Sequence, residues 1–251
     1  MKLLNLLIIL LLPLGSFAQR LKQDAKGIIY DKEKALDMRI HTHGWTVGYQ
    51  IGKIKTYYKT VFYNFELGEL KHHKEVRKST DFSSISPSSG FRSYTFGKQN
   101  YGFVLRGGIG AKRYYTEKAA KNGVAVGLVY SGGLTAALMK PYYVEVGGTR
   151  DGSASQSIKY SPETSKNFLD PYKIRGKGGL LKGINETSII PGIHAQAGVH
   201  VDWGAFDEFL KAVEVGVMLD VFPKKLPIMV TEENRPYFMN LYVSLQLGKR
   251  N

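Results

Sequence analysis

Apolar and polar residues alternate with a period of two in the C-terminal part of the chain. In residues 210–222 the apolar set is Val213, Val215, Val217, Leu219 and Val221, and the opposite set is Ala212, Glu214, Gly216, Met218 and Asp220. Successive side chains of a β-strand point to opposite faces. The pattern therefore predicts a strand with one apolar face and one face that carries carboxylates.

Two further segments, 237–248 and 189–203, repeat this alternation. In 189–203 the face opposite the apolar positions is polar or glycine throughout, and includes His194, Gln196 and Asp202. A soluble β-sandwich could not bury such a row without polar partners, whereas the lumen of a membrane barrel accommodates it. The pattern thus favours a barrel with lipid outside.

Weaker alternation marks five more candidate strands, at residues 38–52, 57–68, 99–112, 123–134 and 142–146. A hairpin is expected where residues 53–56 link the first two of these segments. The count is eight strands, with ten as the alternative. The predicted fold class is all-β: an antiparallel transmembrane β-barrel interrupted by two long connections, 69–98 and 147–186.

The N-terminus has the layout of a secretory signal peptide. Lys2 precedes an apolar run that ends near Leu14, and small residues follow up to Ala18 and Gln19. The run of about a dozen apolar residues is shorter than the roughly 20 that a membrane-spanning helix needs. We therefore predict a signal peptide at 1–18, cleavage after Ala18, and a single barrel domain at 19–251.

The first long connection raises a question of parity. If eight strands start and end in the periplasm, 147–186 lies outside the cell, but 69–98 lies inside, where turns are normally short. Either a strand is missed or the chain has a periplasmic insert, and we favour the insert. Its basic residues Lys71, Lys74, Arg77 and Lys78 would then bind a periplasmic partner, unless the run is simply a solvated loop.

Composition adds information on partners. The chain has a formal net charge of +14, with 28 glycines, 16 tyrosines, 12 phenylalanines and no cysteine. Glycine and aromatic residues suit strands, tight bends and aromatic girdles. A basic exported chain without a nucleic-acid motif is expected to meet outer-membrane lipid and lipopolysaccharide phosphates rather than nucleic acid.

No complete catalytic or metal constellation is visible. His200 and Asp202 face the same way on one segment, and Ser244 is a conceivable nucleophile, so these three are weak candidates for a lipid-modifying relay. Nothing in the sequence brings them together, and a polar lumen explains them equally well. We predict no enzyme activity.

Three histidine pairs, His41/His43, His72/His73 and His194/His200, lack a third ligand. The first pair is expected to share a strand face, and the side chains of the second to diverge on a strand. The glycines at 107–110 have no following helix, which excludes a dinucleotide loop. We therefore expect no metal and no cofactor.

The junction Ala18-Gln19, the antiparallel pattern that follows it, and the segments Phe96-Gly97-Lys98-Gln99-Asn100 and Tyr130-Ser131-Gly132-Gly133 resemble small outer-membrane β-barrel proteins of the Bacteroidota. The resemblance implies this fold and an outer-membrane location, and it carries over no catalytic residue. Some barrels of this type serve secretion machinery.

The expected function is therefore a structural, binding or accessory role in the cell envelope, alone or as a subunit of a larger assembly such as a secretion system. A narrow channel for small polar solutes is the alternative if the barrel has ten or more strands, because an eight-stranded lumen is filled by side chains. A lipid A-modifying enzyme is the third alternative.

Overall fold

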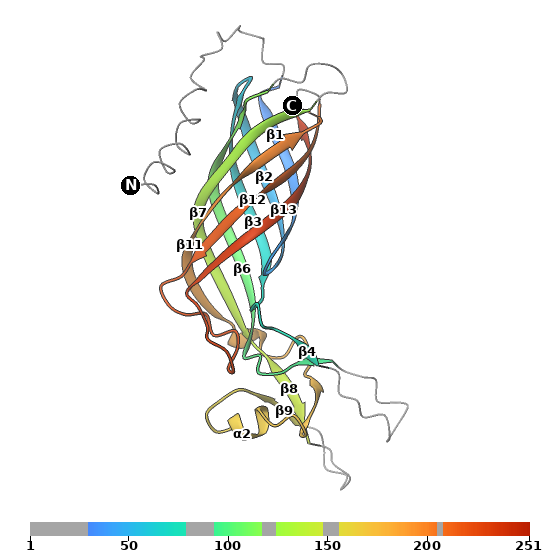
Figure 1. The fold of residues 1–251 in the computed structure, drawn as a ribbon, viewed down its shortest axis with the longest axis vertical. Helices are drawn as coiled ribbons and strands as arrows, with labels where there is room; N and C mark the ends of the chain where they lie inside the picture. Colours follow the sequence, from blue (N-terminus) through green and yellow to red (C-terminus); the bar gives the residue numbers. More distant parts are fainter. Residues whose placement is uncertain (1–29, 79–92, 117–123, 148–155, 205–207) are drawn as a thin grey trace, which may run out of the picture.

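Eight antiparallel strands close into one barrel, in the order β1-β13-β12-β11-β7-β6-β3-β2 (Figure 1). The computed structural model describes residues 30–78, 93–116, 124–147, 156–204 and 208–251. The barrel strands are β1 Lys32–His41, β2 Gly44–Thr56, β3 Lys59–Leu70, β6 Asn100–Tyr114, β7 Ala125–Pro141, β11 Ser188–Asp202, β12 Phe209–Val221 and β13 Tyr237–Arg250. The predicted fold class is confirmed, while the expected signal peptide at 1–18 lies outside the described residues.

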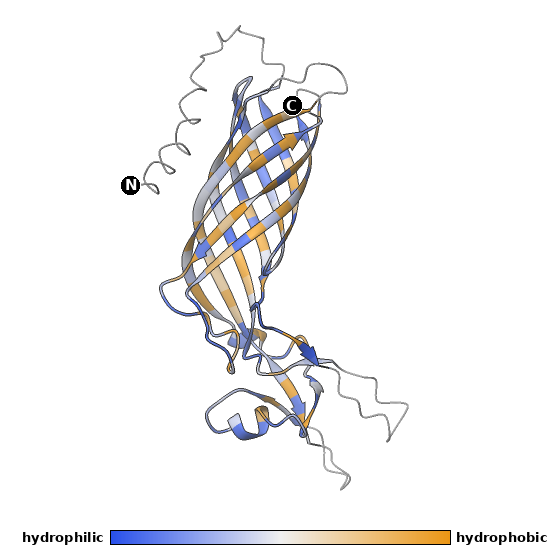
Figure 2. Cartoon of the chain, viewed as in Figure 1, coloured by the Kyte–Doolittle hydropathy of each residue, from blue (hydrophilic) through white to orange (hydrophobic). Residues whose placement is uncertain are grey.

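Buried and exposed residues alternate along the barrel strands. The apolar residues are on the exposed side and the charged residues on the buried side, the reverse of a water-soluble protein. The outward positions carry large apolar side chains, such as Ile40 at 75% and Leu134 at 72% exposure, whereas charged residues such as Arg39 and Glu214 are buried inside. Figure 2 shows apolar positions on every side of the barrel that is in view. This is the alternation of a barrel that spans lipid.

The segment predicted as one strand at 38–52 is two strands, and this prediction is wrong. β1 and β2 meet in a tight turn at Thr42 and His43. β1 extends back to Lys32, where Glu33 and Asp37 occupy inward positions and are buried. The alternation of apolar and polar residues did not predict a strand here, because so many residues of the stretch are charged and charged side chains are normally expected to face water.

Two other boundaries also differ from expectation. Residues 53–56 continue β2 instead of forming a hairpin link, and the turn falls at Tyr57 and Tyr58. Residues 142–146 contain β8 (Tyr143–Val146), which pairs outside the barrel. The count of eight is therefore correct, but β1 replaces the 142–146 segment in it.

Counting β1 places both long connections at the same end of the barrel. This long-loop end carries 42–43, 71–99, 142–187 and 222–236, and the opposite, terminal end carries 57–58, 115–124 and 203–208. At the terminal end the backbones of Lys32 and Asn251 exchange hydrogen bonds of 2.8 and 2.9 Å. The expectation that the two long connections lie at opposite ends is wrong, because it left out the strand β1.

Small additional elements form a cap at the long-loop end (Figure 1). They are a two-stranded sheet of β4 (Arg77–Lys78) and β5 (Tyr94–Thr95), a sheet in the order β10-β8-β9 with β9 Gln156–Lys159 and β10 Ile174–Lys177, the helix α2 (Ser165–Phe168) and the 3-10 helix η2 (Ile184–Glu186). The cap has its own apolar core around Tyr142, Val144, Phe168 and Ile174. In the part of the chain that the structure describes, no helix has the length and apolarity to cross a membrane.

Two adjacent glycines of β7 allow a test of the inward packing. A Cβ on Gly133 would lie 2.2 Å from the Gly107 oxygen, whereas a Cβ on Gly132 would meet nothing nearer than 3.4 Å. Gly133→Ala should destabilise the barrel by about 1–3 kcal/mol by overpacking, and Gly132→Ala should be near neutral. Folded barrel and heat-unfolded chain run as separate bands on a detergent gel, and the measurement is the temperature at which half of the folded band is lost. Equal temperatures for both variants would contradict the strand register between β6 and β7.

Candidate functional site

The middle of the lumen is filled by an ion-pair network around Arg39. This guanidinium lies 2.5 Å from Asp37 and 3.2 Å from Glu66, and it donates to Gln196 Oε1 at 2.7 Å. It also lies 4.5 Å from the centroid of the Tyr242 ring. Glu66, Gln196 and Tyr242 come from β3, β11 and β13, so Arg39 on β1 links separate parts of the wall across the lumen.

Arg106 forms the second cross-link of the lumen. Its Nε and Nη2 both donate to the Asp220 carboxylate at 2.8 Å, the paired geometry that suits a guanidinium and a carboxylate. Nη1 donates to Thr46 and lies 3.8 Å from Glu66, which connects this pair to the Arg39 network. Arg106, Asp220 and Glu66 are all buried. Their mutual ion pairs supply the partners that buried charges require.

A third group fills the lumen near the terminal end. Lys112 Nζ lies 2.9 Å from Glu33 and also donates to Gln246. Arg250, which pairs with Glu33 across the seam between β1 and β13, bridges Glu33 at 3.0 Å and Asp202 at 2.6 Å. Residues from both ends of the chain thus lock the closing seam from inside.

The weak catalytic candidates lie in this third group. His200 Nδ1 is 2.9 Å from Glu214 Oε1, and its Nε2 is 3.2 Å from the Tyr114 hydroxyl, which in turn donates to Asp202 at 3.1 Å. The carboxylate that orients His200 is therefore Glu214. Ser244 pairs across the strands with Glu214, and its side chain is almost fully buried.

At the long-loop end an apolar plug replaces the ion pairs. Leu226 and Ile228, from the connection 222–236, are fully buried against the ends of the strands, together with Phe222 and Phe238. Backbone bonds hold the connection in place, including the donation of Gln99 N to Ile228 O at 2.8 Å. The lumen is therefore filled by charged groups along its length and by apolar groups at its mouth.

Sequence analysis found the polar inner face but missed the residues that organise it. Arg39, Arg106 and Lys112 were assigned no role. The available signal was a charged residue at an inward position of several strands, such as Glu66, Lys112 and Asp220. Within the glycines at 107–110, Gly110 allows close packing inside the barrel, since a Cβ there would lie 2.4 Å from the Phe62 ring.

The histidine pairs are separated or engaged in local bonds. His41 ends β1 and His43 lies in the turn, so the two do not share a strand face, although both Nδ1 atoms approach Asn240 Oδ1, at 3.3 and 2.6 Å. His72 and His73 lie outside any strand and their ring centroids are 4.4 Å apart, which corrects the expectation that they diverge. Among the described residues no group of three or more metal-ligating side chains occurs.

The predicted basic residues lie at the long-loop end. Lys74 Nζ is 2.8 Å from Glu232 Oε2, and this hydrogen bond lowers the pKa of Glu232. Lys71 Nζ is 3.0 Å from Glu69. Both lysines remain substantially exposed, and ion pairs at such sites are weak enough to exchange for other anions.

The other two basic residues form part of β4. Arg77 and Lys78 pair with β5, and Lys78 Nζ lies 4.9 Å above the Phe96 ring. Nearby, burial lowers the pKa of Lys98 while its partner Glu75, 2.5 Å away, opposes the shift. The four predicted residues therefore share one end of the barrel, opposite to the end where Lys32 and Asn251 lie.

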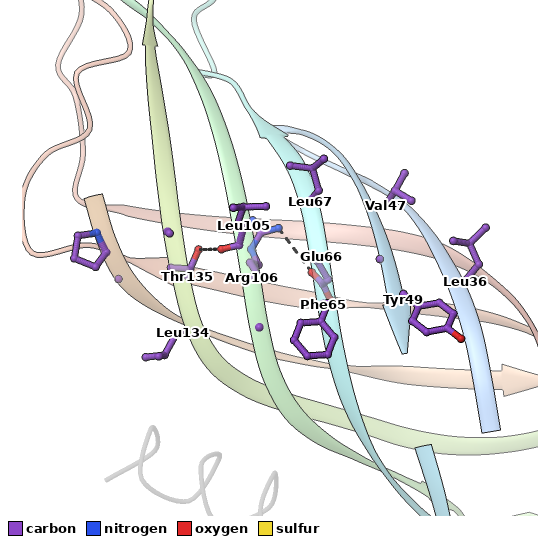
Figure 3. A pocket seen from close by; sticks show the side chains of 15 residues that line it. Leu36, Val47, Tyr49, Phe65, Glu66, Leu67, Leu105, Arg106, Leu134 and Thr135 are labelled. Atoms are coloured by element: carbon purple, nitrogen blue, oxygen red, sulfur yellow. Dashed lines mark hydrogen bonds and ion pairs between the residues drawn. The ribbon is translucent and has the colours of Figure 1, made fainter. Parts of the chain in front are cut away.

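The outer wall contains a hollow of about 750 Å³, shown in Figure 3. It lies between two rows of outward side chains, with Tyr49 and Phe65 in one row and Leu67 and Leu105 in the other. Gly107 leaves space for the hollow, because it has no side chain at an outward position whose cross-strand neighbour is the large Phe65. Most of its lining belongs to the apolar outer surface, and Glu66 and Arg106 of the lumen network are also among the residues that line it.

No protein-family model and no curated protein matches the chain. Solved structures are similar in fold: the N-terminal β-barrel domain of Pseudomonas aeruginosa OprF (11% identity, 88% of this chain and 98% of that one, TM-score 0.37) and Neisserial surface protein A (8%, 88% and 97%, 0.41). The attachment invasion locus protein Ail of Yersinia pestis, solved with a heparin analogue, is also similar (8%, 88% and 97%, 0.31).

The chain's own structure defines its class. The outer surface is apolar around the barrel, every barrel strand is paired on both edges, and the interior carries the charges. Aromatic residues stand outward at both ends, with Trp45 and Tyr237 at the long-loop end and Trp203 and Phe209 at the other. The protein is a small membrane-spanning β-barrel of the bacterial outer-membrane type.

The Arg39 network predicts a large loss of stability when its central cation is removed. Arg39→Met leaves Asp37 and Glu66 buried without this partner, which should cost about 3–5 kcal/mol. Lys225→Met, which breaks an exposed pair with Glu233, is the control and should cause no measurable change. Urea unfolding from lipid vesicles, followed by tryptophan fluorescence, would reveal the difference, and equal midpoints would contradict the network's role.

Proposed function

We propose that this chain is an accessory or binding protein of the bacterial outer membrane, which acts through its long-loop end and does not conduct solutes through its lumen. The barrel serves as a rigid anchor in this proposal. The long-loop end faces outside, because outer-membrane barrels have short periplasmic turns and longer external loops. A structural role and membership in a larger assembly, such as a secretion system, are two forms of the same proposal.

The filled lumen is the observation that carries the proposal. Arg39, Arg106 and Lys112 each hold carboxylates across the interior, and Leu226 lies in the plug at the mouth. An ion or sugar would have to displace several buried ion pairs to pass. The alternative of a narrow channel loses its support, because it required ten or more strands.

The basic long-loop end is the proposed contact surface. Lys71, Lys74, Arg77 and Lys78 gather there, and the chain as a whole is strongly basic. Such a surface favours lipopolysaccharide phosphates or an acidic protein partner. The resemblance of the sequence to Bacteroidota barrels supports an envelope role of this kind.

The lipid A-modifying enzyme has less support. His200 is bonded at both ring nitrogens, and it lies with Asp202 and Ser244 in the buried interior, away from the lipid–water boundary where lipid A is bound. Mass spectrometry of lipid A from cells with and without the protein tests this alternative. Identical spectra would remove it.

Planar bilayer recordings test the closed lumen. Purified protein, shown to be folded by its heat-dependent gel shift, should give no steady single-channel steps after insertion, because the interior is filled. Arg39→Ala/Arg106→Ala, which empties the middle of the lumen, is the comparison and should raise leak events. Steady steps from the unmodified protein would overturn the proposal.

A charge-matched pair of variants tests the contact surface. Replacing Lys71, Lys74, Arg77 and Lys78 with Gln should weaken binding to immobilised lipopolysaccharide by at least about tenfold at low salt, given about 1 kcal/mol per cation near an anionic surface. The control replaces Lys32, Lys34, Lys53 and Lys55, exposed at the terminal end, and removes the same charge. Equal losses in both variants would show that only net charge matters.

A further inference from the structure

The segment that precedes β11 is fixed against the rim of the barrel at the end of β7. Lys140 Nζ, near the end of β7, donates to the backbone oxygen of Leu180. Gly183 adopts a positive φ of 77° and fits against Tyr143, where a Cβ would lie 2.8 Å from the ring. η2 follows at once and leads into β11, so residues 180–184 have a defined place beside the outer wall.

This fixed segment leaves three large aliphatic side chains uncovered. Leu180 is 60% exposed, Leu181 81% and Ile184 52%. A single exposed leucine is ordinary. Here three large aliphatic residues lie within five positions, in a segment that specific contacts hold in place. Exposing this apolar patch to water costs about 25 cal/mol per Å². The patch therefore requires a cover.

The patch continues the lipid-facing surface of the barrel. Ile189, three residues after η2, is exposed on the outer face of β11 and pairs with Leu138 of β7. Further along the same two strands, Ile193 and Leu134 are also exposed and pair with each other. The segment and this apolar part of the wall thus lie on the same β7–β11 side of the barrel.

The charges around the patch suit an anionic surface. Lys177 and Lys182 are exposed on either side of the leucines. The carboxylate of Glu186 accepts hydrogen bonds from Lys159 at 2.8 Å and from the Tyr143 hydroxyl at 3.1 Å. These bonds neutralise the acid of the segment, so the lysines dominate its field.

We propose that residues 180–184 form an interfacial anchor, in which Leu180, Leu181 and Ile184 enter the outer leaflet at the barrel rim and the flanking lysines contact lipid phosphates. The occupant is the lipid surface itself. A segment with apolar residues on one side and lysines beside them lies in the interface with its apolar side chains ~5–10 Å into the headgroup boundary. The inference rests on the proposed membrane location and long-loop orientation.

Single-cysteine labelling tests the anchor, and the natural chain contributes no cysteine of its own. Leu181→Cys is labelled with an environment-sensitive fluorophore in the full-length protein, reconstituted in vesicles of phosphatidylcholine and phosphatidylglycerol. Tyr172→Cys, at a cap residue that is 93% exposed, is the aqueous control. Leu134→Cys, on the outer wall, is the lipid control.

Nitroxide-bearing lipids should quench the label at Leu181 as they quench the label at Leu134. Iodide quenching at Leu181 should fall below about a third of the value at Tyr172, because an interfacial side chain lies below the headgroups. If Leu134 is in lipid but Leu181 is as open to iodide as Tyr172, the anchor is wrong and the membrane barrel stands. If the Leu134 label is also in water, the membrane assignment fails and the anchor fails with it.

Discussion

Closure of the sheet is the constraint on which the rest of this structure depends. In hydrocarbon no water is available to bond an open strand edge, so β1 must pair with β13 as well as with β2. The seam is complete from Glu33 opposite Arg250 to His41 opposite Tyr242. Once closed, the sheet has only an inside and an outside, and every strand residue must suit one of them.

The inside is lined by buried polar and charged residues, and many of them bond to one another across the lumen. This explains why arginines dominate the network: a guanidinium offers several donors in a fixed plane and can hold two or three partners. Arg39 and Arg106 each join strands that are far apart in the barrel order. A lumen held in this way favours rigidity, which is consistent with the proposed role of the barrel as an anchor.

The outward alternation could be read from the sequence, and the inner network could not. Valines and leucines mark β12 and β13 because lipid accepts only apolar side chains, whereas β1 was missed because Glu33, Asp37 and Arg39 find their partners across the lumen. Those partners are distant in the chain, as with Arg39 and Gln196, 157 residues apart. No local pattern in the sequence predicts such a pair. The same holds for His200, which was considered together with Asp202 but is bonded to Glu214 in the structure.

The long-loop end combines basic residues with a folded cap, and a membrane-spanning barrel needs neither for its own stability. Its cap is attached to the barrel through β7, and the Tyr142 hydroxyl accepts a hydrogen bond from Thr95 N at 3.0 Å, which joins the two long connections. An unstructured basic loop would serve to attract anions over a distance, but it would not hold its charges in a fixed arrangement. A cap with its own apolar core does so, and the proposed contact at this end would therefore involve an arranged surface as well as electrostatic attraction.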